Sequence, residues 1–184
     1  MKEKIKRTDF SGAIRFVSIS PHGDPEGVVL DDGSFIKMPP HSVKEKGLFK
    51  VGAVVSGSGQ LLTESPNRVF HRAKLEQDKK ILADDSMEKP EREGPKEKPK
   101  EDKMTRQDAP ANQIKMSGKV VAVGTKPKGE VDRMIFDDGT SVHIPKEVEF
   151  SSKEVKIGDR FEVEGEARLY DKRRFLKAET IRHL

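Results

Sequence analysis

The sequence contains no cysteine and no tryptophan, and it has a single tyrosine among its 184 residues. Without cysteine, disulfide bonds, thiolate catalysis and cysteine-ligated zinc sites are excluded. Exposed tryptophan and tyrosine rings would be needed to stack on sugars, so an oligosaccharide-binding protein is disfavoured. The charged segment from Met1 to Arg7 is followed by no apolar region, and no stretch approaches the length of a membrane span. We therefore expect a cytoplasmic protein without a membrane partner.

A large excess of charge of one sign is also lacking. Charged residues make up 37% of the chain, yet the net charge is only +4. This balance is mildly basic and falls short of that of a dedicated DNA-compacting protein. The charge is compatible with nucleic-acid binding, but the composition alone does not indicate that function.

The chain contains the same domain twice. Ser11 to Gly59 aligns with Ser117 to Gly165 without a gap, and one residue of slippage then places Phe70 on Phe175. The coinciding residues are mostly those that set backbone shape, above all the Asp-Asp-Gly at 31–33 and at 137–139. Each copy is close to the lower size limit for a self-sufficient core and leaves no room for a buried cleft of the usual enzyme size. The predicted organisation is a basic tail over 1–9, domains over 10–75 and 116–184, and a linker over 76–115.

Each copy is expected to form five strands. Asp-Gly supplies the positive φ angles of a tight hairpin turn between the second and third strands. The strands are predicted at 10–20, 28–30, 35–38, 53–58 and 68–75, and again at 116–125, 131–137, 140–144, 159–165 and 173–181. A long first strand and a short link after the third favour an all-β chain of two OB-like barrels. An SH3-like barrel or an open meander fits the same pattern.

The segment between the two copies differs in composition. Residues 88–103 consist mostly of Lys, Glu and Pro and contain almost nothing to bury, which predicts a disordered charged linker. A brief helix is expected at 77–87. Such a linker would let the two barrels sit independently on one ligand and add avidity.

The stretch from Pro21 to His41, with Asp31-Asp32-Gly33 and Pro39-Pro40, resembles a family of small bacterial OB-fold proteins of uncharacterised function. Their motif is close to NPxGEVDGLLLxDGTxVxFPPH, followed by VxxGDxVxVxG. The second copy matches it at 127–132, 137–140 and 156–165, but Arg133 replaces a Gly, and Lys146-Glu147 replaces Pro-His. The resemblance implies an OB fold and, by analogy of fold alone, nucleic-acid binding.

No pattern of catalytic or metal-ligating residues stands out. The Asp-Asp-Gly triplets lack the later oxygen donors of a calcium loop and are interpreted as turns. No serine lies in a nucleophile elbow, and no glycine-rich loop precedes a helix. The histidines have neither metal-ligand spacing nor a partner cysteine; they are His22, His41, His71, His143 and His183. We therefore expect no enzyme activity, no metal and no cofactor.

The candidate binding surface is the face of the second and third strands with its flanking loops, where OB folds hold ligands. Alternation places Ile36 and Met38 inward, matched by Val142 and Ile144 in the second copy. It leaves Phe35 and Lys37 facing outward, as a base-stacking platform requires. The predicted nucleic-acid contacts are Phe35, Lys37, His22, His41, Arg68, His71 and Arg72 in the first copy, and Lys126, Lys128, His143, Tyr170, Lys172, Arg173 and Arg174 in the second.

The leading hypothesis is a non-enzymatic tandem OB-fold protein that binds single-stranded DNA or RNA weakly through each barrel and more tightly through both. A row of glutamates at 162, 164 and 166 in the second copy opposes it, because it would repel a phosphate backbone. The alternative is a protein-interaction module in which the spaced barrels dock a partner protein.

Overall fold

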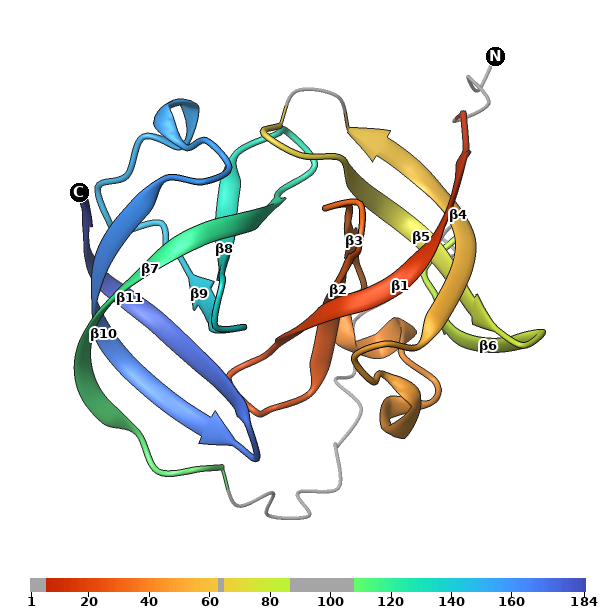
Figure 1. Cartoon of the computed structure of the whole chain (residues 1–184), viewed down its shortest axis with the longest axis horizontal. Coiled ribbons are helices and arrows are strands. Elements are labelled where there is room, and N and C mark those ends of the chain that lie inside the picture. The colour runs from red at the N-terminus through yellow and green to blue at the C-terminus, as the bar shows by residue number, and fades with distance from the viewer. Residues whose placement is uncertain (1–5, 63–64, 87–107) are drawn as a thin grey trace, which may run out of the picture.

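The computed structural model describes residues 6–62, 65–86 and 108–184 and shows an all-β chain of two closed five-stranded barrels (Figure 1). The predicted fold class is thereby confirmed. The prediction of a disordered linker falls mainly on 87–107, which lie outside the described residues. In the part that is described, no helix is long and apolar enough to cross a membrane.

The first barrel follows OB topology. Its strands run in the order β3-β2-β1-β4-β5, and a parallel pairing of β3 with β5 closes the barrel. Two single turns of 3-10 helix, η1 and η2, lie between β3 and β4. The elements are β1 (Thr8–Ile19), β2 (Pro25–Leu30), β3 (Phe35–Lys37), η1 (Pro40–Ser42), η2 (Lys46–Leu48), β4 (Val54–Leu62), β5 (Val69–Gln77) and β6 (Lys80–Asp84).

The second barrel repeats this plan. The order β10-β11-β9-β8-β7 closes on itself, and β9 pairs in parallel with β11 as β3 does with β5. Its elements are β7 (Asn112–Thr125), β8 (Val131–Phe136), β9 (Ser141–His143), η3 (Ser152–Glu154), β10 (Arg160–Tyr170) and β11 (Arg173–His183).

The two Asp-Asp-Gly triplets form the expected hairpin turns. Gly33 and Gly139 have φ angles of 85° and 86°, in the left-handed region that glycine adopts most easily. The side chain of Asp32 accepts a hydrogen bond from the backbone of Ser34, as that of Asp138 does from the residue two positions on. The interpretation of these carboxylates as turn residues is confirmed.

The inward sets were predicted correctly. Ile36 and Met38 belong to the core of the first barrel and are fully buried, while Val142 and Ile144 belong to the core of the second. Alternation along β3 and β9 therefore turns every second side chain, Phe35 and Ser141 included, away from its own barrel.

The helix expected at 77–87 is wrong. Residues 80–84 form β6, which pairs antiparallel with β5 through a turn in which Asp78 and Lys79 have positive φ angles. The segment is extended because its backbone pairs with that of β5 from Lys80 to Asp84, and Leu82 and Ala83 are buried in the barrel core. The first domain thus reaches Asp84, beyond the predicted boundary at 75, and the second begins at Asn112 rather than at 116.

The two barrels pack against each other, and in Figure 1 they lie side by side. A separate apolar cluster joins Val29, Phe35 and Val69 of the first barrel to Ala122 and Ile135 of the second. Around it, Asn67 receives a 2.9 Å hydrogen bond from the backbone nitrogen of Val123 and donates one of 3.2 Å to its carbonyl. The expectation of barrels that sit independently on a ligand is therefore wrong, because the outward apolar side chains of one barrel cover those of the other.

Candidate nucleic-acid interface

The predicted stacking platform is not available to a ligand. Phe35 points out of its own barrel as expected, yet it is only 2% exposed because the second barrel covers it. A Cβ atom on Gly124 would lie 3.1 Å from the Phe35 ring, so the absence of a side chain at Gly124 gives the ring its place. The prediction that Phe35 stacks on bases is wrong.

The interface is made by the same face of both copies. Phe35 on β3 lies against Gly124 on β7, and its counterpart on β9, Ser141, receives a 3.1 Å hydrogen bond from the backbone nitrogen of Ile19 on β1. Since Ile19 aligns with Thr125, next to Gly124, the two contacts are related by an approximate two-fold axis. Such an arrangement is that of an isologous dimer, here fixed within one chain.

Arg133 forms the polar centre of this interface. Its guanidinium pairs with Glu26 of the first barrel and donates hydrogen bonds of 2.7 Å to the hydroxyl of Ser18 and 3.1 Å to the carbonyl of Ile19. Burial lowers the pKa of Arg133 to about 10. Its counterpart in the first copy is Gly27, so this difference between the two repeats marks an interface residue.

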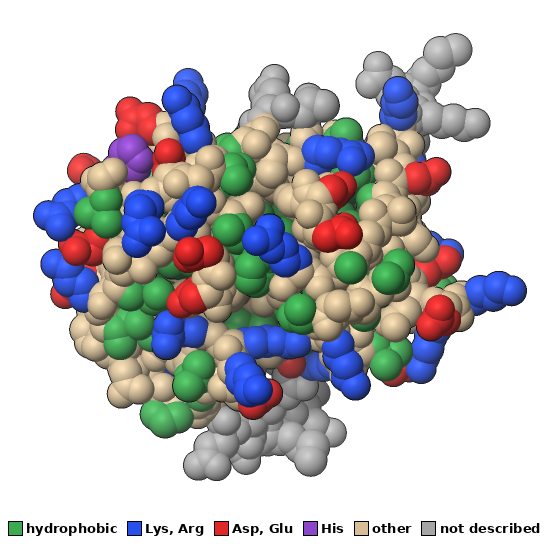
Figure 2. Space-filling model, in the orientation of Figure 1, with side chains coloured by type: hydrophobic (Ala, Val, Ile, Leu, Met, Phe, Trp, Pro, Cys, Tyr) green, Lys and Arg blue, Asp and Glu red, His purple; other side chains and the backbone are tan. Residues whose placement is uncertain are grey.

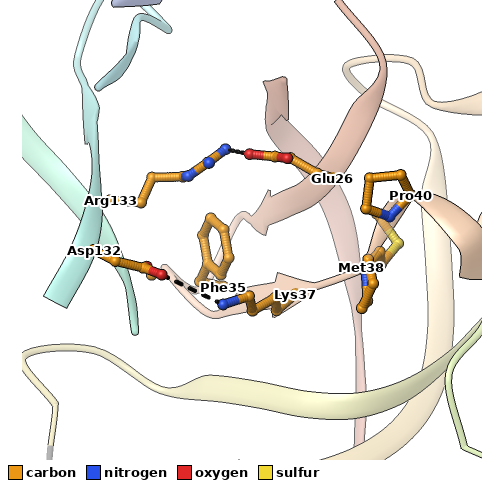
Figure 3. Close-up of a pocket in the computed structure, with 9 residues that line it drawn as sticks. Glu26, Phe35, Lys37, Met38, Pro40, Asp132 and Arg133 are labelled. Atoms are coloured by element: carbon orange, nitrogen blue, oxygen red, sulfur yellow. Dashed lines mark ion pairs between the residues drawn. The ribbon is translucent and has the colours of Figure 1, made fainter. Parts of the chain in front are cut away.

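Lys37 is likewise engaged between the barrels. Its ammonium lies 3.6 Å from the carboxylate of Asp132 and donates a 3.4 Å hydrogen bond to the carbonyl of Thr125. Figure 3 shows Lys37 and Asp132 on one side of a cavity, with Arg133 and Glu26 on the other. The cavity measures about 250 Å³. All four charges that line it are paired with one another, so Lys37 offers no free charge to a phosphate.

Two of the predicted histidines are covered by other side chains, His71 almost fully and His143 in part. His71 is buried, its Nε2 has no hydrogen-bond partner among the described residues, and desolvation with the nearby Lys37 charge lowers its pKa to about 4. His143 stacks on Phe175 with ring centroids 6.3 Å apart, and desolvation lowers its pKa as well. Both rings are held neutral near pH 7, so neither supplies a positive charge to a phosphate.

Tyr170 joins two loops of opposite barrels. Its hydroxyl donates a 2.5 Å hydrogen bond to the carbonyl of Pro21, and its ring lies against Gly23. In the same region the ring of His22 lies 2.9 Å from the carboxylate of Asp108, which also pairs with Arg168. Tyr170 and His22, predicted as contacts in separate barrels, thus lie close together, and their polar groups are used within the chain.

The remaining predicted contacts are scattered. Arg68 pairs with Asp32, His41 with Asp85 and Lys126 with Glu130, at 3.6, 3.3 and 3.0 Å. Within the described part of the chain no contact joins these side chains to one another. Two further predicted residues, Arg72 and Lys128, are exposed.

The basic side chains at the start of β11 lie close together, and the first barrel contributes further basic side chains beside them. Arg173 donates a 2.7 Å hydrogen bond to the carbonyl of Phe49, which places β11 beside the turn that carries the exposed Lys50. A 2.7 Å hydrogen bond from Gly52 to the carbonyl of Ile14 sets that turn next to Arg15. We call this surface the basic junction; it comprises Arg15, Lys50, Lys172, Arg173 and Arg174, with Asp138 and Asp171 among them.

Arg15 and Lys50 of the basic junction were missed by sequence reasoning. They lie in the first copy, far along the chain from 172–174, and only the packing of one barrel on the other brings them together. Arg15 also lies over the ring of Phe16, 5.3 Å from its centroid, and Phe16 packs near Gly139 of the second barrel. No signal in a single sequence reports such a juxtaposition.

The two-fold-related junction has different chemistry. There Val121 takes the place of Arg15, and Ile157 follows the counterpart of Lys50. These two residues line an open groove of about 580 Å³ with Leu61 and Leu62 of the first barrel, and Arg68 lies at its side. Duplication thus produced two equivalent junctions, one of which is basic and the other apolar.

Charge elsewhere is mixed. Figure 2 shows Lys and Arg side chains interleaved with Asp and Glu across the face in view, without a continuous basic band. In the second barrel the glutamate row is partly neutralised, because Glu162 pairs with Lys115 and Arg182 at 3.0 and 2.9 Å.

No family model, curated protein or solved structure matches this chain. The resemblance to small bacterial OB-fold proteins stays a prediction.

Proposed function

We propose that this protein is a non-enzymatic binding protein that holds single-stranded DNA or RNA at the basic junction. The supporting observation is the meeting of Arg15 and Lys50 from one barrel with the 172–174 cluster from the other. Cations from separate elements along one surface suit the phosphates of an extended strand, because each neutralised phosphate releases counterions. Phe16, at the edge of the basic junction, is half-buried and offers a ring on which a base can stack.

This proposal replaces the earlier view of two independent sites. The strand faces on which OB folds hold ligands are buried between the barrels, so the ligand contacts loops and the outer side of β1 instead. The ligand would then bind one composite surface formed by both barrels, not two separate sites that add avidity. Removal of either barrel therefore removes part of the site.

The test is fluorescence anisotropy of labelled single-stranded DNA and RNA at several salt concentrations. In the triple variant Arg15→Gln, Lys50→Gln, Lys172→Gln we expect weaker binding and a salt slope reduced by about 2, since each lost phosphate contact removes about 0.7. The matched control, Lys79→Gln, Lys146→Gln, Lys177→Gln, changes three exposed lysines outside the junction and the same net charge. Equal effects of both variants, or no binding by the wild type at low salt, would reject nucleic-acid binding at this surface.

The apolar junction favours a second function, protein docking. An open groove with Leu61, Leu62 and Val121 along its floor has the character of a contact surface for another protein. Ile157 beside it remains 44% exposed. Binding of a partner there would be insensitive to salt and would be lost on Ile157→Asp, whereas Val51→Asp at the equivalent exposed turn would leave it intact.

A further inference from the structure

The first barrel has a strand, β6, that has no counterpart in the second barrel among the residues that the structure describes. β6 pairs antiparallel with the end of β5, Leu75 opposite Ala83 and Gln77 opposite Lys80. The loop before β4 closes over it, since the backbone nitrogen of Lys44 donates a 2.8 Å hydrogen bond to the carbonyl of Leu82. Leu82 is fully buried, so β6 supplies part of the barrel core as well as a row of hydrogen bonds.

Within the described ranges of the chain, the same edge of the second barrel is open. β6 pairs with Lys74 to Gln77 of β5, whose counterparts, judged from the pairing of β5 with β4 and of β11 with β10, are Thr180 to His183. The edge from Glu179 to Arg182 overlaps them. β9 pairs with β11 only over Phe175–Lys177, and β10 occupies the other side. Among the described residues no strand lies along Glu179 to Arg182 where β6 lies in the first barrel. An unpaired edge of this kind is a template for strand addition.

A cavity lies beside this edge. It measures about 170 Å³ and is lined by Phe150, Phe161, Ile181 and His183, with Glu149 and Glu154 at its side. Phe150 and Ile181 are the counterparts of Lys44 and Leu75, two residues that contact β6 in the first barrel. The cavity therefore occupies the place that β6 fills in the other copy, and it has room for an aliphatic side chain.

The acidic side chains beside the cavity favour a basic residue on the strand that binds there. In the first barrel Lys80 of β6 pairs with Glu45 of the covering loop at 3.2 Å. In the second, Glu149 and Glu154 are exposed and form no ion pair within the described part of the chain. A Lys or Arg on the added strand would complement them. Glu179 and Arg182 on the edge itself discourage indiscriminate pairing.

We propose that the edge of β11 from Glu179 to Arg182 docks an extended segment of a partner protein as a sixth strand, with an aliphatic side chain in the cavity and a basic one toward Glu149 and Glu154. The partner segment takes the place on the second barrel that β6 of the same chain takes on the first. This site lies outside the basic junction, so it does not depend on nucleic-acid binding, and loss of either activity leaves the other intact.

The test uses a synthetic peptide with the sequence of residues 78–86, which carries β6, and the isotope-labelled full chain. At millimolar peptide, amide shifts are expected at Glu179 to Arg182, with the side chains of Phe150 and Ile181 also perturbed. A peptide with Asp in place of the leucine is the matched control. Ile181→Asp should weaken binding at least about tenfold, whereas Leu169→Asp, an exposed position on β10, should not.

Absence of shifts, or equal binding by Ile181→Asp, would overturn the proposal. Sedimentation provides a separate check on the occupant: dimerisation of the full chain that Ile181→Asp abolishes would identify a second copy, not a partner segment, as the strand that docks. A monomer that binds the peptide at the edge supports the proposal as stated.

Discussion

The ring of Phe35 in the first barrel lies against Gly124 of the second, and this contact closes the face on which an OB barrel usually holds its ligand. The first copy places its large side chain there, and the second copy has Ser141 at the equivalent position. Large and small residues thus alternate across the two-fold axis, which lets two nearly identical faces interdigitate.

Replacement of Phe35 by Ala should destabilise the interface. The change leaves a cavity in a buried apolar cluster, and we expect a loss of about 3 kcal/mol in the free energy of unfolding. Urea denaturation with probes in each barrel measures it, and the single wild-type transition should split into two. Leu169→Ala, at an exposed position, is the control and should stay within about 0.5 kcal/mol of wild type. A single unshifted transition in Phe35→Ala would contradict the packing described.

The buried pair of Arg133 and Glu26 should behave as a unit. Glu26→Leu alone leaves a buried guanidinium without its counter-charge, and we expect a loss of about 3 kcal/mol. The double variant Glu26→Leu, Arg133→Met should recover most of that loss, because no charge is then buried. A thermodynamic cycle from the four unfolding curves measures the coupling, and additive effects would show that the two side chains act separately.

His71 should make the stability depend on pH. Its pKa is about 4 in the folded protein and 6.5 in a model peptide, so between these values the unfolded chain binds more protons than the folded one. The contribution is complete above pH 6.5 and is lost as the pH falls toward 4, by about 3 kcal/mol in total. Unfolding curves across this range should show a steeper fall in wild type than in His71→Asn. Lys146→Asn, at an exposed site, is the control and should follow wild type. Parallel curves for wild type and His71→Asn would show that His71 is not buried as a neutral group.

The barrels expressed separately should recognise each other. Residues 6–86 alone would expose Val29, Phe35 and Val69, and residues 108–184 alone would expose Ala122 and Ile135. We expect each to bind a hydrophobic dye and the dye signal to fall when they are mixed, because the two apolar faces cover each other. Titration calorimetry would measure the association, and Arg133→Glu in the second barrel, which repels Glu26, should abolish it. No heat on mixing would contradict an interface formed by these faces.

The sequence predicts the individual barrels well and their relation to each other poorly. Turn residues such as Gly33 and alternation around Ile36 are local signals, so the strands, turns and cores follow from them. Phe35 satisfies the pattern of an outward residue equally well whether solvent, a nucleic acid or another barrel lies beyond it. Arg133 was visible as a departure from the repeat, yet only the structure shows that Glu26 faces it. The strand at 80–84 was missed because five residues after a turn carry too short a pattern to distinguish strand from helix.

The most direct test of the central claim, that the two barrels form one rigid unit with these faces buried, is a measurement of residual dipolar couplings on the full chain. We expect the couplings from residues 8–84 and from residues 112–183 to fit one alignment tensor with the barrels placed as in Figure 1. Two different tensors, one for each barrel, would show that the barrels reorient independently and would contradict the interface and the composite basic junction built on it.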